Sequence, residues 1–373
     1  MLRVLHTADW HLGRPFHGDS LLAAHAAAIE HMVAVARDAR VSAILIAGDL
    51  YDRALPPVDA VRLADEALCR LSEVAPVVVI SGNHDSAPRL GFGASLFDRA
   101  GVHVRTAVAQ IGSPVVLDGL AVFAIPYLEP DLVREELGAG DRGHGPVLEA
   151  AMDRVRAGLV PGARSVVLAH AFVAGASETS SERDLSVGGA ASVPAAVFRG
   201  VDYAALGHLH TPQTVGSSAA YSGSPVAFSF SEVGHAKSVR VVDLAARSAE
   251  VVPVPLWRSL AVLRGSLASL LEDPALAVAE SAWVSVTLTD AVRPEDAMER
   301  LRRRFVHAVL LAFEPEGETA GAGASYAQRH RGLSDTELVA GFVEDVRGAA
   351  ATAEEAGLLE AAMTAGRVRE ASR

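Results

Sequence analysis

Strand-like apolar runs alternate with helix-like stretches along the first part of the chain. Runs rich in valine, isoleucine and leucine lie at residues 2–9, 41–49 and 75–83. Between them, apolar residues recur every three or four positions at 23–39 and 57–73. Short aliphatic runs are typical of buried strands, and the longer period is typical of helices. This alternation predicts an α/β fold with a largely parallel sheet and helices on the outside.

Five further strand-like runs follow before Trp257. They lie at 120–128, 165–171, 202–208, 238–244 and 249–256. The last two runs are separated by a short connection, so we expect them to pair antiparallel at the edge of a sheet.

A second, smaller domain is expected after Trp257. A strand-like run at 283–290, a helix from Pro294 to Phe305 and a run at 306–315 form a compact α/β unit. The next stretch is rich in glycine and small polar residues, which indicates a linker. The expected domains are therefore 1–257, 258–315, a linker at 316–332 and a C-terminal helical segment at 333–373.

The C-terminal segment opens with a helix signal. Ser334 followed by Glu337 is a capping pattern, and Leu338, Phe342 and Val346 then recur four residues apart. This spacing stacks the three apolar side chains on one face of a helix. We expect that face to bind a partner protein, and packing against the protein's own small domain is the alternative.

Composition limits the classes of function. A formal net charge of −12 and a pI near 5.6 argue against a nucleic-acid binder that works through a broad basic patch. The only lysine, Lys237, does not follow a glycine-rich loop, so a P-loop ATPase is excluded. No apolar run reaches the about 18 residues of a membrane span, and the first residues do not resemble a signal peptide. With a single cysteine, Cys69, we expect an intracellular protein.

Polar side chains recur where the predicted strands end. They are Asp9, His11, Asp49, Asp52, Asn83, His84, His170, His208 and His210. The carboxyl ends of strands in an open α/β sheet line one crevice, so these residues are expected to converge. Carboxylates, imidazoles and one amide, without a thiolate, suit manganese, iron or zinc. We expect Asp49 to bridge two ions roughly 3.5 to 4 Å apart, the spacing used for in-line attack on a phosphoester.

Each signal has a simpler explanation when it is taken alone. An isolated Asp-X-His is commonly a surface feature, Gly-Asp after a strand is commonly a turn, and His-X-His on an exposed strand is commonly solvated. Their joint occurrence at strand ends favours a metal site.

The motifs, in this order, resemble those of a known family. The chain resembles the calcineurin-like metallophosphoesterases in five motifs. They are Asp-X-His at 9–11, Gly-Asp-X-X-Asp at 48–52, Gly-Asn-His-Asp at 82–85, His170 and Gly-His-X-His at 207–210. Within that superfamily, the chain resembles the SbcD-type nuclease subunits of bacterial SbcC–SbcD complexes. The stretches that carry this resemblance are LHTADWHLGRPFHG, ISGNHDS, ERDLSVGGA, ALGHLHTPQ and YSGSPVAFSFSE.

The resemblance implies a fold and a role for each site residue. The fold would be a metallophosphoesterase sandwich with a small capping domain. The implied ligands are Asp9, His11, Asp49 and His210 for one ion, and Asp49, Asn83, His170 and His208 for the other. His84 would contact the scissile phosphate and help protonate the leaving oxygen, while Asp85 would orient its imidazole. The two divalent ions are expected to be Mn²⁺.

The resemblance also implies a substrate and partners. The protein would be an exonuclease and endonuclease acting on double-stranded ends, hairpins and single strands of DNA, in repair, recombination and replication. It would form a homodimer within a heterotetramer, with the segment after the small domain docked on the coiled-coil base of an SbcC-type ATPase, in the cytoplasm at the nucleoid. Val306 departs from the family pattern, in which a proline is expected.

Two other functions are open at this stage. A phosphomonoesterase or cyclic-nucleotide phosphodiesterase of the same fold would use the same chemistry, although it has no evident need of the extra domain and tail. A non-catalytic scaffold on a decayed phosphoesterase fold is the second, and the complete set of ligands with His84 argues against it.

Overall fold

The computed structural model describes residues 2–177, 179, 181–182, 192–316, 334–347 and 350–371. The chain divides into two units, Met1–Pro315 and Glu316–Arg373. Apart from Glu316, the linker expected at 316–332 lies outside the described residues, as does most of the ERDLSVGGA motif. Within the described ranges, no helix combines the length and apolar character needed to cross a membrane.

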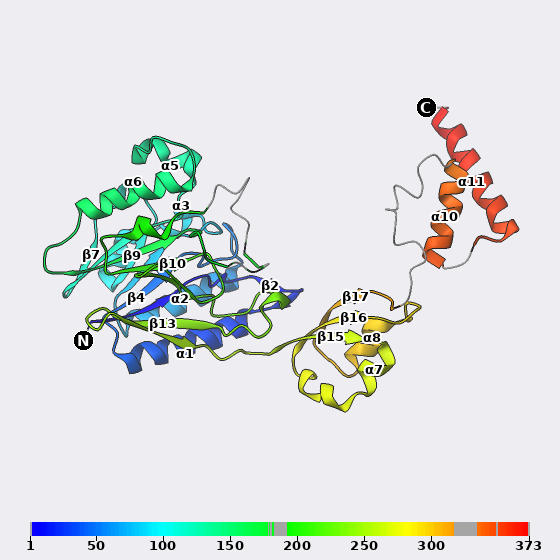
Figure 1. Ribbon diagram of the computed structural model, residues 1–373, viewed down its shortest axis with the longest axis horizontal. Coiled ribbons are helices and arrows are strands. Elements are labelled where there is room, and N and C mark those ends of the chain that lie inside the picture. The colour runs from blue at the N-terminus through cyan, green and yellow to red at the C-terminus, as the bar shows by residue number, and fades with distance from the viewer. Residues whose placement is uncertain are drawn as a thin grey trace. The chain divides into compact units, whose positions relative to one another are not determined.

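The first unit is built on two six-stranded sheets (Figure 1). The first sheet has the order β14 (Ser248–Pro253), β13 (Ser238–Asp243), β1 (Arg3–Thr7), β4 (Ala43–Ala47), β5 (Val77–Ile80) and β6 (Val102–Arg105). The strands β1, β4, β5 and β6 are parallel, whereas β13 pairs antiparallel with β1 and with β14. The antiparallel pair predicted at a sheet edge is therefore confirmed.

The second sheet is also parallel at its centre. Its order is β11 (Gln213–Val215), β12 (Ala219–Tyr221), β10 (Tyr203–Gly207), β9 (Arg164–His170), β8 (Leu120–Ile125) and β7 (Val115–Leu117). The four central strands are parallel, and the edge strands β7 and β11 are antiparallel to their neighbours.

The two sheets pack face to face, and helices cover their outer faces. The core between the sheets includes Val4, Leu45, Val78, Val122, Val166 and Ala205. The outer faces are covered by α1 (Leu22–Ala39) and α2 (Val58–Ser72) on the first sheet and by α5 (Pro130–Leu137) and α6 (His144–Ala157) on the second. Figure 1 shows α5 and α6 on one side of the sheets and α1 on the other. Both faces of the central strands are thus buried, which explains their continuous apolar runs and confirms the predicted α/β sandwich.

A separate parallel sheet follows, with its own core. It consists of β15 (Leu260–Gly265), β16 (Trp283–Leu288) and β17 (Ala308–Phe313), with α7 (Leu267–Glu272) and α8 (Ala297–Arg302). β15 was not predicted from the sequence, because most of this strand is only partly buried and its apolar signal is weak. The helix predicted from Pro294 to Phe305 is shorter, since it begins only after Asp296, whose φ of 50° is not helical.

The small sheet contacts the sandwich through Trp283. Its indole Nε1 donates to Asp19 Oδ2 at 3.0 Å, and its ring lies 4.9 Å from the ring of Phe16. These two partners belong to a hairpin of β2 (Pro15–Phe16) and β3 (Asp19–Ser20), which follows the Asp-X-His motif. Two short helices, α3 (Ala87–Leu90) and α4 (Ala94–Phe97), follow β5.

The second unit contains α10 (Asp335–Arg347) and α11 (Ala353–Ala371). Glu337 N donates to Ser334 Oγ at 3.3 Å, and Ser334 N donates to Glu337 Oε2 at 2.7 Å. This reciprocal pair confirms the predicted capping pattern. Thr352 and Glu355 form the same arrangement at the start of α11, a helix that the sequence pattern did not predict separately.

Candidate metal centre

The expected site residues meet where strands of both sheets end. Asp9 N donates to Gly48 O at 3.1 Å, and His11 N donates to Asp49 O at 3.0 Å, so the loops after β1 and β4 run side by side. His208 N, after β10, donates to both carboxylate oxygens of Asp9 at 2.9 and 3.1 Å. The two sheets approach closely here, because a Cβ at Gly207 would lie 1.9 Å from the carbonyl oxygen of Ala47.

Strained backbone conformations gather at this place. Eight non-glycine residues of the described chain have a positive φ, and four of them are expected ligands. They are Asp9 at 55°, His11 at 46°, Asp49 at 48° and His208 at 108°. A residue with a side chain adopts such angles only when the surrounding structure imposes them, and these cases cluster at functional sites.

The first group of side chains contains Asp9, His11 and His210, all buried. The Nε2 atoms of His11 and His210 lie 3.2 Å apart, and His11 Nε2 lies 3.6 Å from Asp49 Oδ2. Burial lowers the pKa of both imidazoles well below the ordinary value. The His210 ring adds to the shift of His11, and the positive charges of Lys237 and Arg14 add to that of His210. Both rings are therefore neutral at pH 7, and nitrogen lone pairs are available for a cation.

The second group contains Asp49, Asn83 and His170. His170 Nδ1 donates to the carbonyl oxygen of Ala47 at 3.0 Å, which leaves the lone pair on Nε2. That atom lies 2.9 Å from Asn83 Oδ1 and 3.5 Å from Asp49 Oδ2. Burial lowers the pKa of His170 to about 3. Three acceptor atoms that face one another are stabilised by a cation among them, and an imidazole that donates its other N–H to a carbonyl is typical of metal ligands.

The carboxylates complete a donor set that fits divalent metal ions. Burial raises the pKa of Asp9 well above the ordinary value, and the negative charge of Asp49 raises it further. Burial likewise raises the pKa of Asp49 to about 6. Neutral imidazoles and buried carboxylates match the ligand preferences of manganese, iron and zinc. The ring of His208 lies edge-on to that of His170, with centroids 5.5 Å apart, beside this second group.

His84 lies at the edge of the first group and is half-buried. Its Nδ1–H donates to the carbonyl oxygen of Asp52 at 2.7 Å, and its backbone N–H donates to Asp49 Oδ1 at 2.8 Å. Its ring packs edge-on against His11, with centroids 4.6 Å apart. These contacts fix the ring and leave Nε2 for another partner.

The prediction that Asp85 contacts and orients the imidazole of His84 is wrong. The carboxylate of Asp85 accepts hydrogen bonds from the backbone N–H groups of Gly82, Leu50 and Tyr51 at 2.9 to 3.1 Å. Burial raises its pKa to about 7, and the charge of Asp49 adds to this shift. The turn at 82–85 directs the carboxylate toward the loop after β4, so Asp85 holds that loop and the Asp52 carbonyl orients the ring.

Three residues that the sequence pattern did not predict contact the site. The Nδ1 of His210 lies 2.6 Å from Ser181 Oγ, and His210 N donates to Glu182 Oε1 at 2.8 Å. Arg14 donates from Nη2 to the carbonyl oxygen of Ser181 at 2.9 Å. Their spacing along the chain carried no signal for these contacts, although Glu182 begins one of the motifs that resemble SbcD.

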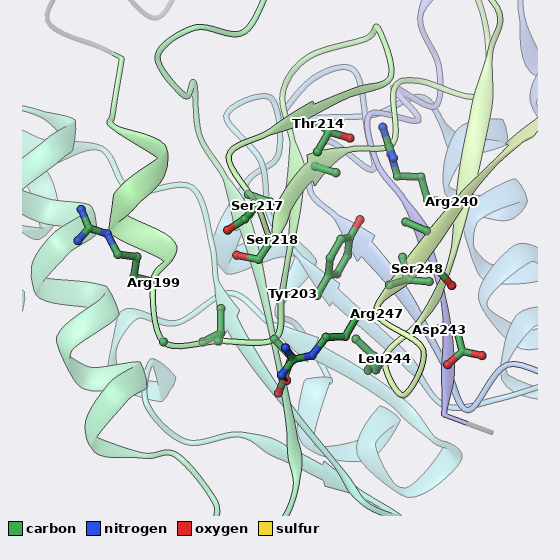
Figure 2. Close-up of a pocket in the computed structure, with 17 residues that line it drawn as sticks. Arg199, Tyr203, Thr214, Ser217, Ser218, Arg240, Asp243, Leu244, Arg247 and Ser248 are labelled. Atoms are coloured by element: carbon green, nitrogen blue, oxygen red, sulfur yellow. Dashed lines mark ion pairs between the residues drawn. The ribbon is translucent and has the colours of Figure 1, made fainter.

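A separate cavity of about 410 Å³ lies toward the amino end of β10, opposite the end that carries His208. None of the expected ligands lines it. Figure 2 shows Arg199, Arg240 and Arg247 with their guanidinium groups pointing in different directions, so the three do not form one anion-binding cluster. The cavity is therefore not the candidate active site.

The chain belongs to the calcineurin-like phosphoesterase family, which it matches over residues 2–212. Residues 257–347 match the type 5 capsule protein repressor C-terminal domain. The chain is 38% identical over 258 residues to the SbcD component of the nuclease SbcCD of Bacillus subtilis (strain 168), a match that covers 65% of this chain and 66% of that protein. The match thus spans slightly less than two thirds of the relative. These matches confirm the resemblance to SbcD-type subunits.

The chain is also similar to solved structures, among them the following. The crystal structure of TT1561 of Thermus thermophilus is 15% identical, with a TM-score of 0.42, and the match covers 68% of this chain and 99% of that one.

Metal binding should weaken in acid because protons compete for Asp49. The carboxylate has a pKa of about 6 without metal, so it gains a proton as the pH falls through that value, whereas His170, with a pKa of about 3, stays neutral. We expect the affinity for Mn²⁺ to fall by about tenfold or more per pH unit below pH 6, because Asp9, whose pKa is also raised, takes up a proton as well. Calorimetric titration from about pH 7.5 to 5, with circular dichroism to verify folding, measures this. An affinity that is unchanged at pH 5 would contradict the prediction.

Proposed function

We propose that the protein is the metal-dependent DNA nuclease subunit of a complex with an SbcC-type ATPase. The observation that carries this proposal is the position of Asp49 Oδ2, 3.6 Å from His11 Nε2 and 3.5 Å from His170 Nε2. One carboxylate between two groups of neutral imidazoles suits two divalent ions, and Mn²⁺ suits the mixed oxygen and nitrogen ligands. The name of the Bacillus subtilis relative supports nucleic acid as the substrate.

Each site residue has a role in this proposal. One ion would be held by Asp9, His11, Asp49 and His210, and the other by Asp49, Asn83, His170 and His208. When bound, the ions would activate a water molecule and neutralise charge on the phosphate. His84 Nε2 would carry a proton to the leaving oxygen, because Nδ1 is engaged by the Asp52 carbonyl.

The proposed substrates are double-stranded ends, hairpins and single strands of DNA, in repair, recombination and replication. The net charge of −12 is unfavourable for binding DNA, so the partner ATPase would contribute part of the affinity for DNA. We further propose that the protein acts in the cytoplasm at the nucleoid.

Replacement of His84 by alanine should separate catalysis from metal binding. We expect His84→Ala to slow cleavage of a labelled hairpin duplex about 10²–10⁴-fold in Mn²⁺, because a proton donor is lost while the ligands remain. Calorimetry should still find two Mn²⁺ ions. The matched control is His103→Ala, which should cleave normally. His103 lies on β6 of the first sheet, and its imidazole is hydrogen-bonded to Asp98. Loss of metal from His84→Ala, or hydrolysis of simple phosphomonoesters alone by the wild type, would contradict the proposal.

We propose that α10 binds the partner ATPase. Leu338 is partly buried, whereas Phe342 is 57% exposed and Val346 is also exposed. Within its own unit this apolar face is therefore not covered, as a helix that docks into a partner's groove requires.

A charge on the exposed face of α10 should weaken the partner complex. We expect Phe342→Asp to cost several kcal/mol of affinity, because an unpaired carboxylate would be buried at the interface. Cleavage of short single strands by the isolated subunit should persist. Leu358→Asp, at a similarly exposed position of α11, is the matched control. Co-purification with the ATPase measures the effect, and a lowered melting temperature with unchanged co-purification would show that Phe342 belongs to the protein's own core.

We propose that the subunit forms a homodimer through an apolar patch beside β5. The patch consists of Leu55, Val58, Phe92 and Leu96, all exposed, with Phe92 at 83%. Its two segments are joined, since Arg89 Nη1 donates to the carbonyl oxygen of Ala54 at 3.1 Å. Exposed apolar side chains on joined segments, which a second copy covers with the same residues, are a usual basis of a twofold dimer.

Phe92→Asp should convert the dimer to a monomer in sedimentation velocity, because it places two carboxylates in a self-complementary apolar interface. Leu132→Asp, at an equally exposed position of α5, should sediment as the wild type. Dimerisation of both variants would place the interface elsewhere.

A further inference from the structure

His210 is fixed by neighbouring segments at its backbone and at its ring. Its N–H donates to Glu182 and its Nδ1 lies against Ser181. Its carbonyl oxygen accepts from Ser224 N at 3.1 Å and from Lys237 Nζ at 3.3 Å. The position of Nε2, the atom that faces His11, therefore follows from contacts made elsewhere on the residue.

Lys237 is the only lysine of the chain, and its side chain is 1% exposed. Its Nζ contacts acceptors from three segments: the His210 carbonyl, Ser224 Oγ at 2.9 Å and the carboxylate of Glu232, with which it forms an ion pair. An ammonium group has three donors and no acceptor, so all its hydrogens are used. The planar fork of an arginine would not meet three acceptors arranged in this way.

The segment that follows β12 closes around His210 at Gly223. This residue has a φ of +75°, and a Cβ there would lie 2.9 Å from the His210 carbonyl oxygen. Ser224, the next residue, contacts both that carbonyl and Lys237. Glu232 in turn accepts from Phe228 N at 3.3 Å. Through Lys237, the ion pair thus links residues 223–232 to His210, which lies in the loop after β10.

We propose that Lys237 and Glu232 are positioning residues that hold His210 where it ligates one metal ion, acting through the His210 carbonyl. The inference rests on the proposed function, because it takes His210 to be a ligand. In the part of the chain that the structure describes, no hydrogen bond or ion pair joins this pair to Asn83 or His170. Only one of the two ions therefore depends on it.

The test removes the ion pair without leaving an unpaired charge in the interior. Lys237→Met alone would leave Glu232 buried and unpaired, and such a variant can fail to fold. The double variant Lys237→Met with Glu232→Gln is neutral and keeps an acceptor for Phe228 N. We expect calorimetric titration with Mn²⁺ to show one ion bound about 10–100-fold more weakly, the usual effect of losing a group that orients a ligand, and the other ion unchanged. Cleavage should lose kcat with KM for DNA unchanged, and excess Mn²⁺ should restore it.

Two controls separate positioning from a purely structural role. Arg304→Met with Glu280→Gln removes a more exposed ion pair that likewise makes backbone carbonyl contacts, in the small domain, and should leave both affinities unchanged. Ser224→Ala, which keeps the ion pair, should weaken the same ion to a smaller extent. Wild-type affinity for both ions in a folded double variant, or in Ser224→Ala, overturns the inference. Fewer than two ions bound by the wild-type protein would instead refute the proposed function.

Discussion

The close approach of β10 to β4 is the constraint on which the site depends. At Gly207 the two sheets leave no room for a side chain, because a Cβ would lie 1.9 Å from the carbonyl oxygen of Ala47. The same carbonyl accepts from His170 Nδ1, and His208 N reaches the carboxylate of Asp9. Ligands from one sheet are thereby placed against ligands from the other. Neither sheet alone carries a complete set.

The site concentrates groups that are unfavourable to bury in the absence of a cation. Neutral imidazoles and carboxylates with raised pKa values meet where four of the expected ligands also have strained backbones. Each unsatisfied buried acceptor reduces the free energy of unfolding, so such an arrangement is typical of groups that serve a function. Burial lowers the pKa of Lys237, whereas the carboxylates of Glu232, Glu182 and Asp9 raise it, so its ammonium group offsets part of this cost.

The remaining parts of the chain relate to this centre in different ways. The small sheet is attached to the sandwich through Trp283, which contacts a hairpin only a few residues beyond His11. The second unit has its own capping interactions at the start of both helices. An enzyme for small phosphate esters would need neither addition, whereas a nuclease that works with a partner has a use for both.

The sequence by itself determined most of the central strands, their alternation with helices and the kinds of residue at the site, whereas its pattern predicted neither β6, β7, β11 and β12 nor the division into two sheets. Burial on both faces of a parallel sheet requires continuous apolar runs, and ligands at strand ends stand directly after those runs, so both features are local and readable in the sequence. The partners of Asp85 and His84, the contacts of Ser181 and Glu182 and the weakly apolar β15 depended on tertiary structure. Each is decided by segments that are distant in sequence or by a backbone turn, and no periodicity records such contacts. Lys237 is the clearest case: it is conspicuous in the sequence as the only lysine, yet its place beside His210 follows only from the packing of three separate segments.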